Sequence, residues 1–272
     1  MTTKSETALQ RRRPAPLVRA SIATHLAGVA AIIARPPLWP WVAGAVAANH
    51  GLLAAAGLWP RSQWLGSNWV RLPDAAVARR QVAITIDDGP DPEVTPQLLD
   101  ILDGHGARAS FFCIGERVAA HPRLAGEIIR RGHDIENHSL RHLHRFSLLG
   151  RAGMRAEVQG AQQLIADVTG VAPHFFRAPA GLRNPFLDPV LAALGLQLAS
   201  WTRRGFDTLR GETDRVLARL LHGLAAGDIL LLHDGHAART AAGKPVAAEV
   251  LPRLLAAVRA ANLQAVTLRA AL

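Results

Sequence analysis

Two adjacent carboxylates follow a short apolar run in this sequence. Asp87 and Asp88 come directly after residues 81–86, and Gly89 follows them. Neighbouring carboxylates repel each other, so a folded protein rarely keeps both ionised without a cation or strong hydrogen-bond donors nearby. An Asp-Gly pair after a strand is also compatible with a simple turn. The pentapeptide at 85–89 alone leaves both interpretations open.

A pair of histidines later in the chain favours the chemical interpretation. His138 and His142 have i, i+4 spacing, which would place both imidazoles on one face of a helix. Two histidines and one carboxylate from elsewhere form a three-ligand metal site that keeps a position for water. The other carboxylate would be free to move protons, which is hydrolase chemistry. The alternative for the histidines is a hydrated helix face.

The composition limits the function classes. With 272 residues the chain has room for one domain and an appendage. The net charge of +10 comes almost entirely from arginine, because only Lys4 and Lys244 are lysines. No basic stripe interleaved with aromatic residues is present, so we expect no nucleic-acid partner. An anionic lipid or glycan remains compatible with the charge. Cys113 is the only cysteine and cannot form an internal disulfide; we expect a small buried apolar residue there.

Residues 1–74 differ from the rest of the chain. Arg11–Arg13 precede the apolar stretch Ala20–Ala34, and the stretch Leu38–Trp59 has no formal charge. The second stretch is long enough to cross a bilayer. We expect a basic segment followed by a membrane-associated helical hairpin, at the bacterial inner membrane. Two Ala-rich helices packed on the main domain are the soluble alternative. Five tryptophans lie near the ends of the apolar stretches, as interfacial residues do: Trp39, Trp41, Trp59, Trp64 and Trp69.

The orientation of the following domain depends on how many stretches span. If both span, Arg11–Arg13 lie on the same side as Arg61 and Arg71, and the positive-inside rule places the domain in the cytoplasm. If only Leu38–Trp59 spans, the domain lies outside. A cleaved signal peptide is disfavoured because the charged segment is long and two apolar stretches follow it.

Residues 75–272 alternate short apolar runs with longer helical patterns. This alternation predicts a parallel sheet with crossover helices. About seven strands favour an α/β fold of the distorted or incomplete (β/α) barrel type, preceded by the hairpin. No G-x-G-x-x-G follows the first strand, which disfavours dinucleotide binding. The expected strands are Val82–Ile86, Ala109–Ile114, His133–Glu136, His174–Arg177, Gln197–Trp201, Asp228–His233 and Gln264–Leu268. The expected helices are Thr95–His105, Glu116–Arg131, Arg151–Thr169, Asn184–Leu194, Asp214–Ala226 and Val246–Ala261.

The polar residues of interest follow one rule of position. The pair Asp87 and Asp88, together with His138, Arg177 and His233, lies at or just past the carboxyl end of an expected strand. These ends meet on one face of a parallel barrel, and that face carries the active site. Residues far apart in sequence are therefore expected to share one cleft.

Five sequence blocks, in order, resemble the polysaccharide deacetylase family, also called the NodB-homology or carbohydrate esterase 4 family. The resemblance covers roughly residues 80–268. It implies a hydrolase that removes N-acetyl groups from amino sugars of a polysaccharide, oligosaccharide or glycolipid, in a catalytic domain over 75–272. The blocks are Thr85–Gly89, His138–His142, Arg177–Gly181, Trp201–Asp207 and Leu231–His233.

The resemblance also implies roles around a divalent metal, most often zinc in this family. Asp88, His138 and His142 would be the metal ligands. Asp87 would be the general base on the attacking water, and Arg177 across the cleft would keep it anionic. The alternative for Arg177 is one more surface arginine in an arginine-rich chain.

The closing blocks supply the remaining roles. His233 would be the general acid for the leaving amine, and Asp207 would hold it cationic or correctly oriented. A core histidine and an unrelated loop carboxylate are the alternatives. Backbone N–H groups near 179–181 would stabilise the oxyanion. The expected substrate-binding residues are Pro179, Ala180, Gly181, Trp201 and Leu231.

Two positions depart from the family pattern. Ala180 stands where many relatives carry an aromatic residue, and Thr208 stands where a tryptophan is frequent. Both changes remove ring surface, so a shallower, more open cleft is expected. Hydrolysis of O-acetyl esters by the same residues is a second enzymatic alternative, and a catalytically silent glycan-binding module is the non-enzymatic one. The sequence leaves the oligomeric state open.

Overall fold

A computed structural model describes residues 14–272, so Arg11–Arg13 lie outside the described residues. Its strands form one sheet in which every pairing is parallel. The order is β5-β4-β3-β2-β1-β7-β6, and β8 also pairs with β1. The strands are β1 Gln81–Asp87, β2 Ala109–Cys113, β3 Asp134–Asn137, β4 Phe175–Phe176, β5 Gln197–Leu198, β6 Arg203–Arg204, β7 Ile229–His233 and β8 Gln264–Val266.

The sheet is curled, which confirms the expected distorted barrel. Laid flat, the two edge strands β5 and β6 would lie about 29 Å apart, because six gaps of about 4.8 Å separate them. The chain from Leu198 to Arg203 joins these edges directly and can cover at most about 18 Å. The edges must therefore approach each other. Strand β6 is additional to the seven strands that the sequence predicted.

The central strand β1 directs its side chains in two directions. All seven of its residues are buried, and Val82, Ile84 and Ile86 belong to the core beneath the surrounding helices. Side chains alternate along a strand, so Thr85 and Asp87 point the other way, into the barrel. This alternation places a carboxylate in the barrel interior at the carboxyl end of its central strand.

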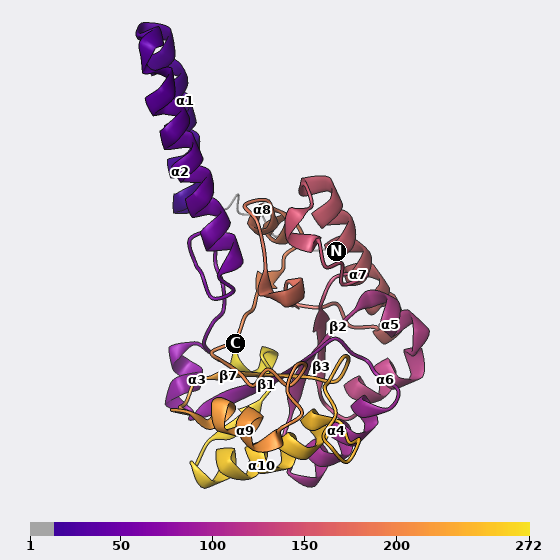
Figure 1. Ribbon diagram of the computed structural model, residues 1–272. Helices are drawn as coiled ribbons and strands as arrows, with labels where there is room; N and C mark the ends of the chain where they lie inside the picture. The colour runs from indigo at the N-terminus through magenta and orange to yellow at the C-terminus, as the bar shows by residue number, and fades with distance from the viewer. Residues whose placement is uncertain (1–13) are drawn as a thin grey trace, which may run out of the picture.

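Helices cover the outside of the sheet (Figure 1). The predicted helix Glu116–Arg131 is divided in two, because Pro122 cannot donate an intrahelical hydrogen bond and begins a second helix. The predicted strands His174–Arg177 and Gln197–Trp201 are each reduced to two paired residues. The helices of this part are α3 Asp74–Ala78, α4 Val94–Gly104, α5 Gly115–Ala120, α6 Pro122–Arg130, α7 Arg151–Thr169, α8 Leu187–Ala193, α9 Thr213–Leu221 and α10 Val246–Ala260.

An N-terminal helical hairpin projects away from the sheet (Figure 1). Helix α1 (Pro16–Ala34) and helix α2 (Trp39–Leu58) have 19 and 20 residues, which gives each a length of about 30 Å. Both are long and apolar enough to cross a membrane. The Asn49 amide donates to Ser21 Oγ at 2.9 Å, so a polar contact joins the two helices. The soluble alternative required the two helices to pack along the main domain, and the hairpin instead projects away from it (Figure 1).

Candidate active site

The carboxyl end of β1 brings Asp87 against a buried arginine. Arg177 follows β4 directly, and its Nη1 donates to Asp87 Oδ1 at 2.6 Å. Only 1% of the arginine surface and 3% of the aspartate surface is exposed. The expected pairing of these two residues is therefore present as a buried ion pair. The surface alternative for Arg177 does not apply.

Arg177 is fixed from several sides. Its Nη1 also donates to Thr85 Oγ1 at 2.9 Å, and its remaining nitrogens donate to the carbonyl oxygens of Ala199 and Ser200 at 3.2 and 2.8 Å. The guanidinium carbon lies 4.0 Å from the centre of the Phe112 ring. A guanidinium with four hydrogen bonds and a fixed orientation holds the Asp87 carboxylate in one place.

Asp88 faces two imidazoles. Its Oδ1 lies 3.2 Å from His138 Nε2 and 3.3 Å from His142 Nε2. Burial alone would raise the pKa of Asp88, but the imidazoles of His138 and His236 that face the carboxylate outweigh burial and hold that pKa well below its ordinary range. Burial lowers the pKa of His142 to about 4, which favours its neutral form. An ionised carboxylate and a neutral imidazole are the forms that bind metals.

These three side chains fit a divalent cation. Asp88 Oδ1 is buried and has no hydrogen-bond partner. His138 Nδ1 lies 2.8 Å from the Arg177 carbonyl oxygen, so its N–H points there and its Nε2 lone pair points at Asp88. Ligand atoms bound tetrahedrally at about 2.0–2.1 Å lie about 3.3 Å apart, which agrees with the two measured separations. The ligand atoms of Asp88, His138 and His142 all lie within 4.8 Å of one another, which is compatible with one shared cation.

The segment 138–142 is a loop, so the expected helix face is wrong. Ser139 and His142 have φ of 66° and 52°, a left-handed conformation that a helix excludes. Ser139 Oγ accepts the His142 backbone N–H at 3.0 Å and closes the turn. Of the eight residues other than glycine that have positive φ in the described part of the chain, six lie in or next to the cleft, where backbone strain is typical of functional sites. They are Asp88, Ser139, His142, Ala180, Phe206 and His236.

Asp207, which the family resemblance relates to His233, contacts it through both carboxylate oxygens. Asp207 Oδ1 lies 2.9 Å from His233 Nδ1, and Oδ2 accepts the His233 backbone N–H at 2.7 Å. Burial alone would lower the pKa of His233, but the Asp207 carboxylate outweighs burial and the net shift is upward. The imidazole is therefore kept cationic to a higher pH, with Nε2 turned away from Asp207.

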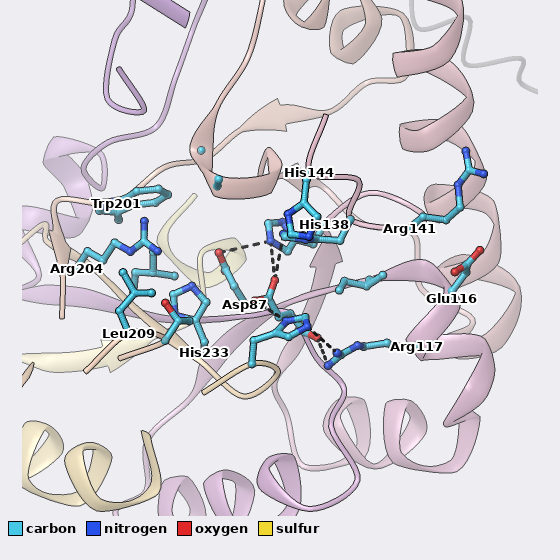
Figure 2. Close-up of a pocket in the computed structure, with 18 of the residues that line it drawn as sticks. Asp87, Glu116, Arg117, His138, Arg141, His144, Trp201, Arg204, Leu209 and His233 are labelled. Carbon is cyan, nitrogen blue, oxygen red and sulfur yellow. Dashed lines mark hydrogen bonds and ion pairs between the residues drawn. The ribbon is translucent and has the colours of Figure 1, made fainter. Parts of the chain in front are cut away.

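One cleft of about 720 Å³ contains this chemistry (Figure 2). Of the expected substrate-binding residues, Ala180, Gly181, Trp201 and Leu231 line it, whereas Pro179 is buried and does not. The Gly181 N–H donates to the Ala178 carbonyl oxygen, and proline has no N–H. Ala180 is thus the residue of this segment whose N–H is left to meet a ligand.

Arg117, Arg204 and His236 are among the cleft residues that the sequence analysis missed. Arg117 donates to the Asp88 carbonyl oxygen at 2.9 Å, and His236 Nδ1 lies 3.4 Å from Asp88 Oδ2. Arg204 lines the opposite wall beside Trp201 (Figure 2). His236 follows the closing block by three residues, so its position was a usable signal. Nothing in the sequence distinguished Arg117 or Arg204 from the other arginines.

Comparison with known proteins identifies relatives. The family model for polysaccharide deacetylase matches residues 74–199, which include Asp87, the metal-ligand candidates and Arg177. A chitooligosaccharide deacetylase from Bradyrhizobium sp. (strain ANU 289) is 35% identical over 58% of this chain and 72% of its own length. A peptidoglycan-N-acetylglucosamine deacetylase from Bacillus cereus is 34% identical over 64% of this chain and 81% of its own. The solved structure of a family 4 carbohydrate esterase from Streptomyces lividans, in complex with acetate, matches with a TM-score of 0.61 and 31% identity over 68% of this chain and 91% of its own.

Proposed function

The chain belongs to the polysaccharide deacetylase family, and from this premise we propose that it is a metal-dependent hydrolase of N-acetyl groups on amino sugars. The sugar would belong to a polysaccharide, an oligosaccharide or a glycolipid. One observation carries the proposal. A carboxylate from β1, two histidines after β3 and a histidine from β7 face one cleft, although up to 146 positions separate them, from 87 to 233. That set is what amide hydrolysis by an activated water needs.

Asp87 is the general base in this proposal. Its Oδ1 is occupied by Arg177, whereas its Oδ2 lies 3.8 Å from His138 Nε2, on the side of the metal ligands. Oδ2 is therefore the oxygen that takes a proton from the attacking water. Arg177 keeps the carboxylate oriented while the proton moves.

Asp88, His138 and His142 would hold a divalent cation, and their one oxygen and two nitrogen ligands suit zinc. When bound, such a cation polarises the acetamide carbonyl and makes a water molecule more acidic. The residues themselves contribute fixed ligand positions. His138 is oriented by the Arg177 carbonyl, and Asp88 by its left-handed backbone.

His233 and Ala180 complete the reaction. His233 Nε2 donates a proton to the amine as the C–N bond breaks, because Nδ1 is already bound to Asp207. The Ala180 N–H is placed to donate to the oxygen that becomes negative after the water attacks. Acetate and a free amine leave the cleft.

The N-terminal hairpin is proposed to anchor the enzyme in the inner membrane. Its apolar side chains are exposed along both helices, including Leu26, Ile33 and Leu52. Trp39 and Trp41 at its tip and Trp59 at its base are also exposed, which suits two interfaces about 30 Å apart. With both helices spanning, the chain enters and leaves on one side. The arginines after the hairpin then favour a cytoplasmic catalytic domain.

An assay with three acetylated substrates tests the function. Purified full-length protein, supplied with zinc, is given acetylated chito-oligosaccharides, peptidoglycan and acetylxylan, and the released acetate and free amine are both measured. We expect acetate and amine in equal amounts from an amino-sugar substrate, and loss of both after chelation. Acetate from acetylxylan alone would indicate an O-acetyl esterase instead. Release that persists unchanged in Asp87→Asn would contradict the mechanism.

A further inference from the structure

The base of the hairpin forms part of the cleft wall. Pro60, one residue after the exposed Trp59, accepts a hydrogen bond from Ser200 Oγ on its carbonyl oxygen at 2.6 Å. A Cβ at Gly181 would lie 2.7 Å from Pro60 Cβ and 2.6 Å from Trp201 Cη2. The chain that leaves the membrane helix therefore contacts the segments that line the cleft. Pro60 at the hairpin base thus packs beside Gly181 and Trp201, which line the substrate site.

The same wall carries a guanidinium that is hydrogen-bonded to none of the described residues. Arg204 lines the cleft and pairs with β7 through its backbone, but no hydrogen bond or ion pair joins its guanidinium to any of the residues 14–272. Its Nε is buried and unsatisfied. Its guanidinium carbon lies 5.5 and 5.0 Å from the ring centres of Trp201 and Phe206, which keep it directed along the wall. By contrast, the cleft arginine Arg141 is paired with Glu157.

The position of Arg204 relates it to the sugar. Arg204 is in register with Leu231 on β7, two residues before His233. His233 donates its proton to the amine of the sugar, so the sugar lies on the His233 side of the metal ligands. Arg204 therefore borders the sugar, on the cleft wall beside Trp201 (Figure 2).

We infer, on the basis of the proposed function, that the substrate is an acetylated amino sugar bearing a phosphate group, which Arg204 binds. A planar guanidinium with unused N–H donors matches phosphate oxygens. Because the base of the hairpin forms part of the cleft wall, the phosphate-bearing sugar that can reach the cleft from the membrane is one linked to a lipid. A soluble sugar phosphate shares this chemistry and would use the same arginine.

The test compares substrates that differ only in the phosphate. Full-length protein in phosphatidylcholine vesicles is given N-acetylglucosamine joined to a long alkyl chain through a phosphate, or joined to the same chain as a simple glycoside. A methyl phosphate ester of the sugar serves as the soluble arm. The readout is the ratio of kcat/KM for the phosphate-linked and the neutral lipid, in the wild type and in Arg204→Gln, Arg204→Lys and Arg219→Gln. Arg219 is the matched control, because it also packs on Phe206, at 5.2 Å, but does not line the cleft.

We expect the wild type and Arg219→Gln to prefer the phosphate-linked lipid about ten- to a hundredfold, the size of a charged hydrogen-bonded contact. Arg204→Gln should reduce the ratio to near one, and Arg204→Lys should retain part of it. A methyl ester as good as the lipid would identify a soluble sugar phosphate as the source. A wild-type ratio near one, or a full preference in a folded Arg204→Gln, would overturn the inference. If neither lipid is deacetylated, the proposed function fails, and the ratio of their dissociation constants still tests Arg204.

Discussion

Asp207 binds His233 through both of its carboxylate oxygens. One oxygen lies 2.9 Å from the imidazole Nδ1, and the other accepts the backbone N–H of the same residue at 2.7 Å. The loop before α9 and the end of β7 are thereby joined at one residue. The carboxylate has no exposed surface, so its charge acts on the imidazole with little screening by water.

Asp207→Asn is expected to change the pH dependence of the enzyme. A general acid must be protonated, and the raised pKa of His233 keeps it protonated to higher pH. Removing the Asp207 charge lowers that pKa, so activity should fall at a lower pH on the alkaline side. The maximal rate should fall about 10²-fold, in the range for general acid catalysis. Profiles of kcat/KM against pH measure this. Asp214→Asn, which alters an exposed carboxylate, serves as the control. If kcat/KM of Asp207→Asn falls at the same alkaline pH as in the wild type, Asp207 does not set the pKa of the general acid.

Arg177→Lys is expected to destabilise the fold as well as the site. A lysine cannot replace donors that reach Asp87, Thr85 and two backbone carbonyl oxygens at once. Buried acceptors left without partners should lower the free energy of unfolding by about 2–4 kcal/mol. Urea unfolding measures the loss. Arg253→Lys, in an exposed ion pair, should leave stability almost unchanged. Equal stability of the two variants would contradict the structural role of Arg177.

Gly181→Ala is expected to disturb the contact between the cleft wall and the hairpin base. The added Cβ would meet Trp201 and Pro60 below 3 Å, and the backbone φ of +74° is unfavourable for alanine. Gly170→Ala is the matched control, with φ of +73° and open space around it. Gly170→Ala should cost about 1–2 kcal/mol for the backbone alone. Gly181→Ala should cost more and also raise KM. Thermal unfolding and steady-state kinetics provide both values, and equal effects of the two changes would contradict close packing at this wall.

The hairpin predicts one membrane side for the catalytic domain. With α1 and α2 both spanning, a reporter fused after Pro73 should be active only if it works in the cytoplasm, because the arginines lie mostly at the base of the hairpin. A fluorescent protein fused at that position reports the cytoplasmic side, and alkaline phosphatase reports the outer side. A fusion after Pro36, at the tip, should give the opposite result. Phosphatase activity after Pro73 would show that one helix at most spans.

Much of the fold followed from local pattern. Strands such as β1 and β7 are continuous apolar runs, and glycines end the helices between them, so the alternation was readable and the barrel followed. Strands β4, β5 and β6 have two residues each. Such short strands are held in place by their neighbours in the curled sheet. Because these contacts come from residues far away in the sequence, the local sequence pattern does not predict where the short strands begin and end.

The site shows the same division. Asp87, Asp88 and His233 were predictable because each ends a clear strand. The loop at 138–142 was not, because its left-handed residues are serine and histidine rather than glycine, the residue that usually marks such a turn in a sequence. Arg204 could not be singled out because its proposed role depends on a guanidinium that is hydrogen-bonded to none of the described residues. That property is visible only once the neighbours on the cleft wall are in place.

The metal content of four variants tests the central claim most directly. Asp88→Ala, His138→Ala, His142→Ala and His144→Ala are purified alongside the wild type, and bound zinc is counted per chain. His144 lines the same cleft but is not one of the three ligand candidates, so it is the matched control. We predict about one zinc in the wild type and in His144→Ala. Each of the other three should lose most of its zinc and its deacetylase activity while remaining folded. Full zinc occupancy in folded His138→Ala and His142→Ala would contradict the account.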